Sequence, residues 1–168
     1  MKKIILLIAE GFGTGLSPIA PGTCGSVIGL LWFLLLIAFQ NLWLYMLGSV
    51  VGILVSIYLC GIAEDILKIK DPPPVVLDEI VSIPVCYIGW VILAKTSAMP
   101  ALSYFFSGKK LIPFLGIFLT FRLLDALKPF PINIIQRLNG GLGIVADDIL
   151  AAILTSIIWF FIIKLSWF

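Results

Sequence analysis

The chain has 168 residues, of which 61% are hydrophobic and 12% are charged, and its formal net charge is +2. Soluble domains are about 25% charged, so this composition indicates a membrane protein, and the small net charge argues against nucleic acid as a partner. The chain has no histidine, which excludes Ser-His-Asp and Cys-His catalysis.

The sequence begins with Met1-Lys2-Lys3 and a short apolar run over residues 4–9. No small-residue cleavage site follows this run, so we predict a short helix, interfacial or within a bundle, that stays on the mature protein rather than a signal peptide. The whole chain, residues 1–168, fits a single domain.

Longer apolar runs predict an all-α fold, a polytopic membrane bundle of about five spanning helices plus short interfacial helices. The runs cover residues 26–39, 42–62, 80–94, 111–124 and 149–163. The polar pair Gln40-Asn41 between the first two runs predicts a tight helical hairpin. The cysteines Cys24, Cys60 and Cys86 lie in or beside apolar runs without CxxC spacing, so we predict packing residues rather than a disulfide or a zinc site.

The charges are sorted between the two sides that five spans would create. If the N-terminus is inside, segments 1–25, 63–79 and 125–148 and the inner edge of the fourth run lie inside. They carry seven Lys and Arg residues against four outside, among them Lys95, which is a modest positive-inside bias. The acidic residues all fall on the inside: Glu10, Glu64, Asp65, Asp71, Asp78, Glu79, Asp125, Asp147 and Asp148. Carboxylates beside hydrocarbon are costly and are kept for pairing, ion binding or function, so this sorting suggests a bound divalent cation.

A block rich in glycine and proline, residues 11–26, predicts an ordered coil before the first long helix. Thr23 and Ser26 are placed where an N-cap would be, with hydroxyls available for substrate. Composition alone favours a tight turn beside a helix start, although such a loop can also present N–H groups to a phosphate. The block is not a P-loop, because no Lys-Ser/Thr pair closes it.

Two adjacent acidic pairs and one charged triplet follow. Asp78-Glu79 opens the third run after Pro72-Pro73-Pro74, and Asp147-Asp148 follows a glycine-rich turn before the last run. One such pair is explained by a helix macrodipole. Two pairs, together with Asp125, favour a metal site, and all-oxygen ligands suit Mg²⁺.

The triplet Arg122, Asp125 and Lys128 has a spacing of three, so its side chains share one side of a helix that Pro129 ends. A plain salt-bridge ladder would also explain this spacing. At the end of an apolar span, however, ionisable groups are taken as functional.

The sequence resembles the phosphatidylglycerophosphatase A family in four blocks, which occur in the family's order. They are GLSPIAPGTCGS at 15–26, DPPPVVLDE at 71–79, FRLLDALKPFPI at 121–132 and GGLGIVADDILA at 140–151. The resemblance implies an all-helical, Mg²⁺-dependent phosphomonoesterase. It would convert phosphatidylglycerophosphate to phosphatidylglycerol and inorganic phosphate in the bacterial inner membrane, with its site facing the cytoplasm.

We therefore expect a metal–phosphate site with residues in three roles. The expected metal ligands are Asp78, Glu79, Asp125, Asp147 and Asp148. Together with Lys128 these five residues are also the expected catalytic set. The expected substrate-binding residues are Arg122, Lys128, Thr23 and Ser26.

Two chemical routes remain open at this point, attack by a metal-activated water and formation of an aspartyl-phosphate intermediate. Two other functions also remain open, a small membrane cation carrier and a structural membrane subunit. The sequence gives no oligomeric state and no acyl-chain preference.

Overall fold

The computed structural model describes residues 2–94 and 98–166, and within these residues the regular structure is helical. The long apolar helices are α2 (Pro21–Ala38), α3 (Leu42–Leu67), α4 (Leu77–Ala94), α6 (Leu111–Leu127) and α8 (Gly140–Ser166). The short elements are α1 (Lys2–Ala9), η1 (Gly11–Leu16), α5 (Leu102–Phe106), η2 (Gly108–Lys110) and α7 (Ile132–Ile135). Lys95, predicted on the outer side, lies outside the described residues.

The prediction of an all-α membrane bundle is confirmed. Four helices, α2, α3, α4 and α8, are long and apolar enough to cross a bilayer. The fifth, α6, has 17 residues, which is the lower limit for a span. Bilayer-facing surface is evident on α3, where Trp43, Leu54 and Tyr58 are 81%, 61% and 69% exposed. Such large exposed apolar side chains are expected to contact lipid.

The hairpin between α2 and α3 is confirmed as well. Asn41 caps α3, because its side-chain oxygen accepts hydrogen bonds from the backbone N–H groups of Trp43 and Leu44 at 2.8 and 3.2 Å. The preceding residue, Gln40, donates from its side chain to the carbonyls of Ile37 and Pro100, both at 3.1 Å. These bonds satisfy polar groups that would otherwise be left open at the helix ends.

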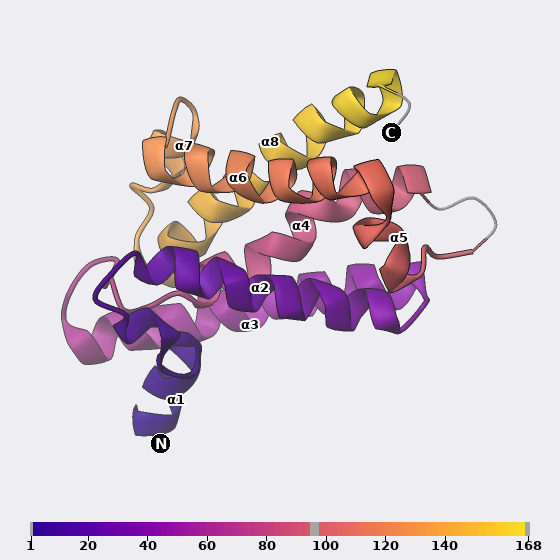
Figure 1. Cartoon of the computed structure of the whole chain (residues 1–168). Coiled ribbons are helices and arrows are strands. Elements are labelled where there is room, and N and C mark those ends of the chain that lie inside the picture. Colours follow the sequence, from indigo (N-terminus) through magenta and orange to yellow (C-terminus); the bar gives the residue numbers. More distant parts are fainter. Residues whose placement is uncertain (1, 95–97, 167–168) are drawn as a thin grey trace.

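The central helix is α4, which lies among the other long helices (Figure 1) and buries about two thirds of its length. Glycines let its neighbours approach closely. A Cβ on Gly29 of α2 would lie 2.8 Å from the carbonyl oxygen of Ile80, and a Cβ on Gly89 of α4 would lie 2.8 Å from that of Ser156 in α8. Small residues at helix contacts are the usual means of packing helices within a membrane.

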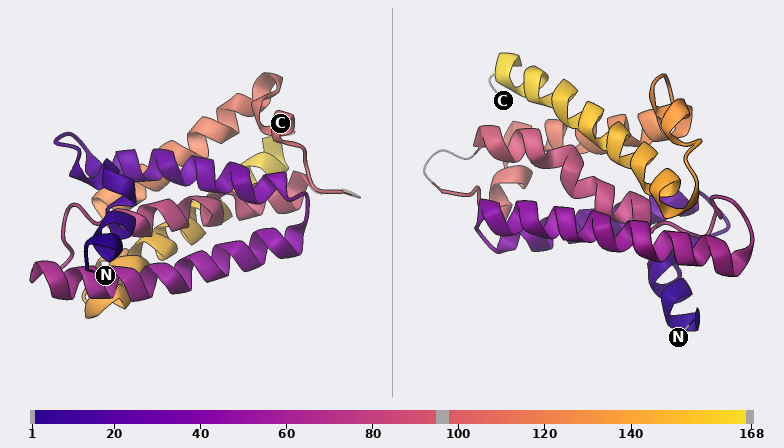
Figure 2. Two further views of the ribbon diagram at one scale, coloured as in Figure 1. Left: turned by 90° about the horizontal axis from the view of Figure 1, so that it is seen from below. Right: turned by 180° about the vertical axis from the view of Figure 1, so that it is seen from behind.

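The first helix, α1, projects from the side of the bundle, across the direction of α2 and α3 (Figures 1 and 2). It buries Ala9 and exposes Lys2, Lys3, Ile4 and Leu7. A short helix that crosses the spans and carries both lysines and apolar side chains is placed to lie in the membrane interface.

Five helix termini meet at one end of the bundle, which we call the acidic end (Figure 1). They are the first residues of α2, α4 and α8 and the last residues of α3 and α6. The predicted inside segments, 1–25, 63–79 and 125–148, therefore come together.

Two local predictions are wrong, because both glycine-rich blocks are more helical than we expected. α2 begins at Pro21, with Ala20 in the N-cap position, so Thr23 and Ser26 lie inside the helix rather than at its cap. Proline at the first position favours such a start. α8 likewise begins at Gly140, in the segment before Asp147-Asp148 where we predicted a glycine-rich turn. A Cβ on Gly141 would lie 1.8 Å from the carbonyl oxygen of Ile57 in α3, so this glycine serves close helix packing.

Candidate active site

Three carboxylates from two helices converge inside the acidic end. Asp78 and Glu79 occupy the first turn of α4, and Asp148 lies about two turns inside α8. One oxygen from each residue lies within 4.8 Å of the others, and Asp78 and Asp148 are only 6% and 2% exposed. We call Asp78, Glu79 and Asp148 the carboxylate trio.

The trio is incompletely satisfied by the protein. Each member has one buried carboxylate oxygen without a hydrogen-bond partner among the described residues. A buried, unpaired charge is strongly unfavourable, and three together also repel one another. A divalent cation would supply the missing partner, and the all-oxygen donors match the preference of a hard ion such as Mg²⁺. The residues present therefore fit a metal ion.

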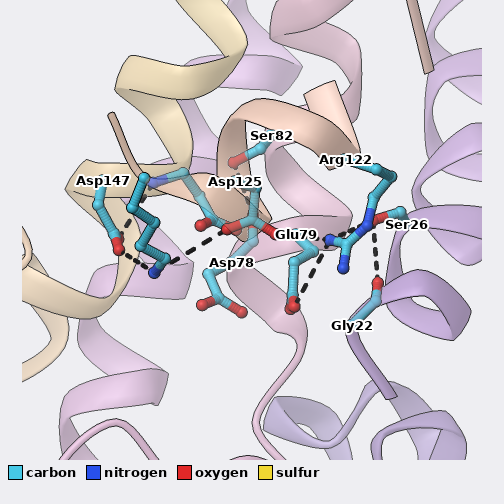
Figure 3. Close-up of polar contacts among 10 residues, drawn as sticks. Gly22, Ser26, Asp78, Glu79, Ser82, Arg122, Asp125 and Asp147 are labelled. Atoms are coloured by element: carbon cyan, nitrogen blue, oxygen red, sulfur yellow. Dashed lines mark hydrogen bonds and ion pairs between the residues drawn. The ribbon is translucent and has the colours of Figure 1, made fainter. Parts of the chain in front are cut away.

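Asp125 of α6 lies beside the trio but is engaged by cations. Its carboxylate accepts a hydrogen bond from Arg122 at 2.7 Å and lies 3.9 Å from the ammonium of Lys128. The same Arg122 nitrogen lies 4.0 Å from Glu79 and donates to the Ser26 hydroxyl at 3.2 Å. Figure 3 shows Arg122 held in this way between Glu79 and Ser26. Arg122 thus connects three helices, which a salt-bridge ladder along α6 alone does not explain.

Lys128 and Asp147 form the opposite side of the cluster. Lys128 is the C-cap residue that follows α6, and its left-handed backbone turns the chain there. Its ammonium forms a hydrogen-bonded ion pair with Asp147, which is 1% exposed. Burial alone lowers the pKa of Lys128, but the hydrogen bond to Asp147 and the nearby carboxylates Asp148 and Asp125 outweigh it and raise the pKa above its ordinary value. Lys128 therefore stays protonated and acts as a fixed positive charge.

The α2 turn shapes the site through Gly22 and Ser26. A Cβ on Gly22 would lie 2.2 Å from Glu79 Oε1 and 3.0 Å from Arg122 Nη2, so a larger residue there would displace the Glu79 carboxylate and crowd Arg122. The Ser26 hydroxyl donates to the Gly22 carbonyl at 2.9 Å while it accepts from Arg122. Ser26 is therefore in a position to orient Arg122, and its predicted contact with substrate stays a prediction. No hydrogen bond of the Thr23 hydroxyl is found within the described part of the chain, which leaves it free at the partly exposed start of α2.

The structure thus brings all five predicted ligand carboxylates together but divides them by partner. The trio has unpaired oxygens, whereas Asp125 is held by Arg122 and Asp147 is held by Lys128. The position of Asp147 and Asp148 well inside α8 also rules out a simple helix-start preference for this pair. Sequence reasoning missed Gly22. The only signal for it was its place after Pro21, where a helix begins.

The charges do not balance within this cluster. Five carboxylates surround two cationic side chains, so full ionisation leaves three negative charges uncompensated. Buried carboxylates this close together stay ionised only with additional positive charge, such as a bound cation, and otherwise take up protons. The arrangement can bind a divalent cation and then hold a phosphate group between the metal, Arg122 and Lys128.

Comparisons with known proteins point to one family. A family model described as Phosphatidylglycerophosphatase A matches residues 7–163. Two similar curated proteins carry that name. The protein of Escherichia coli (strain K12) is 35% identical over 158 residues, which cover 93% of this chain and 81% of the relative. The protein of Haemophilus influenzae is 34% identical over 166 residues, which cover 95% and 92%.

A third relative, from Bacteroides thetaiotaomicron, is 30% identical over 160 residues, which cover 91% of this chain and 89% of the relative. It is provisionally named a phosphatidylinositol-3-phosphatase. No solved structure matches the chain.

Proposed function

The chain belongs to the phosphatidylglycerophosphatase A family, and from this premise we propose that it is a Mg²⁺-dependent enzyme that hydrolyses phosphatidylglycerophosphate to phosphatidylglycerol and inorganic phosphate. The observation that carries the proposal is the carboxylate trio with its unpaired oxygens, placed between Arg122 and Lys128. We further propose that the protein works in the bacterial inner membrane with this site facing the cytoplasm. The positive-inside bias supports this orientation.

Asp78, Glu79 and Asp148 would hold the metal ion. This set is smaller than the five ligands expected from the sequence, because Asp125 and Asp147 already have cationic partners. When bound, Mg²⁺ would polarise the phosphoryl group and lower the pKa of a water molecule.

Arg122 and Lys128 would bind the non-bridging phosphate oxygens from opposite sides of the trio. Both side chains are partly accessible, at 21% and 25% exposure, whereas Asp147 behind Lys128 is sealed at 1%. Asp125 and Asp147 fix the directions of the two cations. Charges that are fixed before the reaction stabilise the negative charge that develops on the phosphate without having to reorganise.

Water is the proposed nucleophile. Each of the five carboxylates already has a role in holding the metal or a cation, so none remains free to attack phosphorus. The water oxygen forms the new bond to phosphorus while the bond to the glycerol oxygen breaks. The proton released by water ends on the glycerol oxygen, which gives phosphatidylglycerol and inorganic phosphate.

The position of the site suits a lipid substrate. The site lies at the ends of apolar helices, so a lipid can keep its acyl chains in the bilayer while its terminal phosphate reaches the trio. A cluster at the helix ends also argues against a cation carrier, in which carboxylates are expected along the middle of the spans.

The direct test is phosphate release by the purified protein in mixed micelles containing phosphatidylglycerophosphate. We expect release that stops on exhaustive chelation and returns with Mg²⁺. Phosphatidylinositol 3-phosphate is the matched comparison lipid, and we expect it to be hydrolysed more slowly. No release from either lipid would leave a carrier or a structural subunit as the function. Phosphate release that survives chelation would refute the proposed dependence on a metal ion.

A further inference from the structure

A second polar depression opens at the acidic end, between the segment that follows α3 and the short helix α7. It has a volume of about 510 Å³ and is lined by Lys70, Asp71, Asn133, Gln136 and Arg137. We call it the vestibule.

The vestibule contains two cations without acidic partners. Neither Lys70 nor Arg137 forms an ion pair within the described residues, whereas Arg122 and Lys128 at the active site are both paired. The one carboxylate in the lining, Asp71, is contacted by the side-chain amide of Gln136 at 3.5 Å. Two free cations and the nearby amides of Asn133 and Gln136 are donors suited to a phosphate group.

The vestibule adjoins the active site through the start of α8. Lys70, Asp71 and Gln136 also line a smaller depression together with Gly140, Gly143 and Ile144 in the first turns of α8. The same helix carries Asp147, the partner of Lys128. A phosphate group in the vestibule would therefore lie beside the Lys128 side of the site, away from Arg122.

The negative charge of the active site is a reason for cationic side chains to lie nearby, because a phosphate substrate is itself negatively charged. Its three uncompensated negative charges become one when a single divalent cation binds. A phosphate monoester carries a charge of about −2 near neutral pH, so it still meets net negative charge there. Lys70 and Arg137 supply two further positive charges at the same end of the bundle.

We propose that the vestibule is a second phosphoryl-binding subsite, in which Lys70 and Arg137 bind a phosphate group next to the one at the trio. This inference rests on the proposed function. Two sources share the required chemistry. One is the phosphodiester that links the substrate's glycerol phosphate to its diacylglycerol, and the other is the inorganic phosphate that leaves after hydrolysis.

The test uses the full-length double variant Lys70→Gln/Arg137→Gln. Lys109→Gln, at the opposite end of the bundle, is the control for a lost surface charge. Three quantities are measured: KM for phosphatidylglycerophosphate, the inhibition constant of inorganic phosphate, and that of phosphatidic acid, which has a phosphate monoester but no phosphodiester.

If the subsite binds the phosphodiester, KM rises about tenfold in the double variant while the inhibition constant of phosphatidic acid is unchanged. If it binds released phosphate, the inhibition constant of inorganic phosphate rises about tenfold and KM is unchanged. The conservative variant Lys70→Arg/Arg137→Lys should restore either value, which a purely structural role of these residues would not predict.

If the double variant has the KM and the phosphate inhibition constant of the wild type, as we expect for Lys109→Gln, the proposal of a second subsite is wrong. Wild-type protein that releases no phosphate would instead refute the proposed function, so the two failures are distinguishable.

Discussion

Replacing Gly22 with alanine should inactivate the enzyme without unfolding it. The new Cβ would lie 2.2 Å from Glu79 Oε1, whereas a carbon–oxygen contact needs about 3.3 Å. The Glu79 carboxylate must therefore move by about 1 Å, and Arg122, at 3.0 Å from the same Cβ, is tightly crowded.

A displacement of this size at a catalytic group lowers the rate by about 10²-fold, which is about 2.7 kcal/mol of transition-state stabilisation. Stability should not fall with it, because Gly22 lies inside α2 and alanine is favoured over glycine in a helix by roughly 0.5–1 kcal/mol.

The assay is kcat/KM for phosphate release, with the thermal midpoint of the detergent-solubilised protein measured in parallel. Gly52→Ala is the matched control, because a Cβ there meets only ordinary contacts, 3.5 Å from Val81 and 3.6 Å from Trp32. We expect Gly52→Ala to keep its activity. A folded Gly22→Ala variant with wild-type kcat/KM would show that the close fit of Gly22 to Glu79 and Arg122 has no catalytic role.

Three further predictions follow from the same cluster. Asp148→Asn should stabilise the metal-free protein, because it removes one repelling charge from the trio. It should also abolish the thermal stabilisation by Mg²⁺. A lower thermal unfolding midpoint of the metal-free variant would contradict the assignment of the trio as a metal site. Lys128→Gln should destabilise the fold by about 3 kcal/mol, since it leaves Asp147 buried without a partner, and adding Asp147→Asn should recover much of that loss, as a double-mutant cycle would measure. In a single turnover in ¹⁸O-labelled water, the label should appear in the released phosphate and rapid quenching should trap no phosphorylated protein; a trapped phosphoprotein would instead indicate an aspartyl-phosphate intermediate.

The long helices, and the placement of the acidic residues at one end of the bundle, could be predicted from the sequence. The reason is that the apolar runs are long and are interrupted by few polar positions. Gln40-Asn41 is such an interruption, and it forms the predicted hairpin. The acidic end follows from the alternation of helices, so the segments that carry Asp78, Asp125 and Asp148 had to meet at one end.

Helix starts in glycine-rich segments could not be predicted in the same way. In water a run of glycines favours a turn, but in a membrane bundle a glycine also lets two backbones touch, as Gly141 does against Ile57. Sequence alone does not separate these uses, because the second depends on the neighbouring helix.

The sequence also does not show which carboxylates are paired with cations and which are left with unpaired oxygens. Asp125, Asp147 and Asp148 have the same chemistry, and only the three-dimensional positions of Arg122 and Lys128 decide which of them are paired. The role of Ser26 depends on contact with Arg122, 96 residues away in the chain, for which the local pattern around Ser26 carries no signal.

The most direct test of the account compares Asp78→Asn with Asp65→Asn in the phosphate-release assay. Both variants remove one negative charge near the acidic end, but Asp78 belongs to the buried trio and Asp65 is exposed near the end of α3. We predict that Asp78→Asn folds with normal yield and releases no phosphate from phosphatidylglycerophosphate, whereas Asp65→Asn remains active. Hydrolysis by Asp78→Asn at the wild-type rate would contradict the assignment of the trio as the catalytic centre.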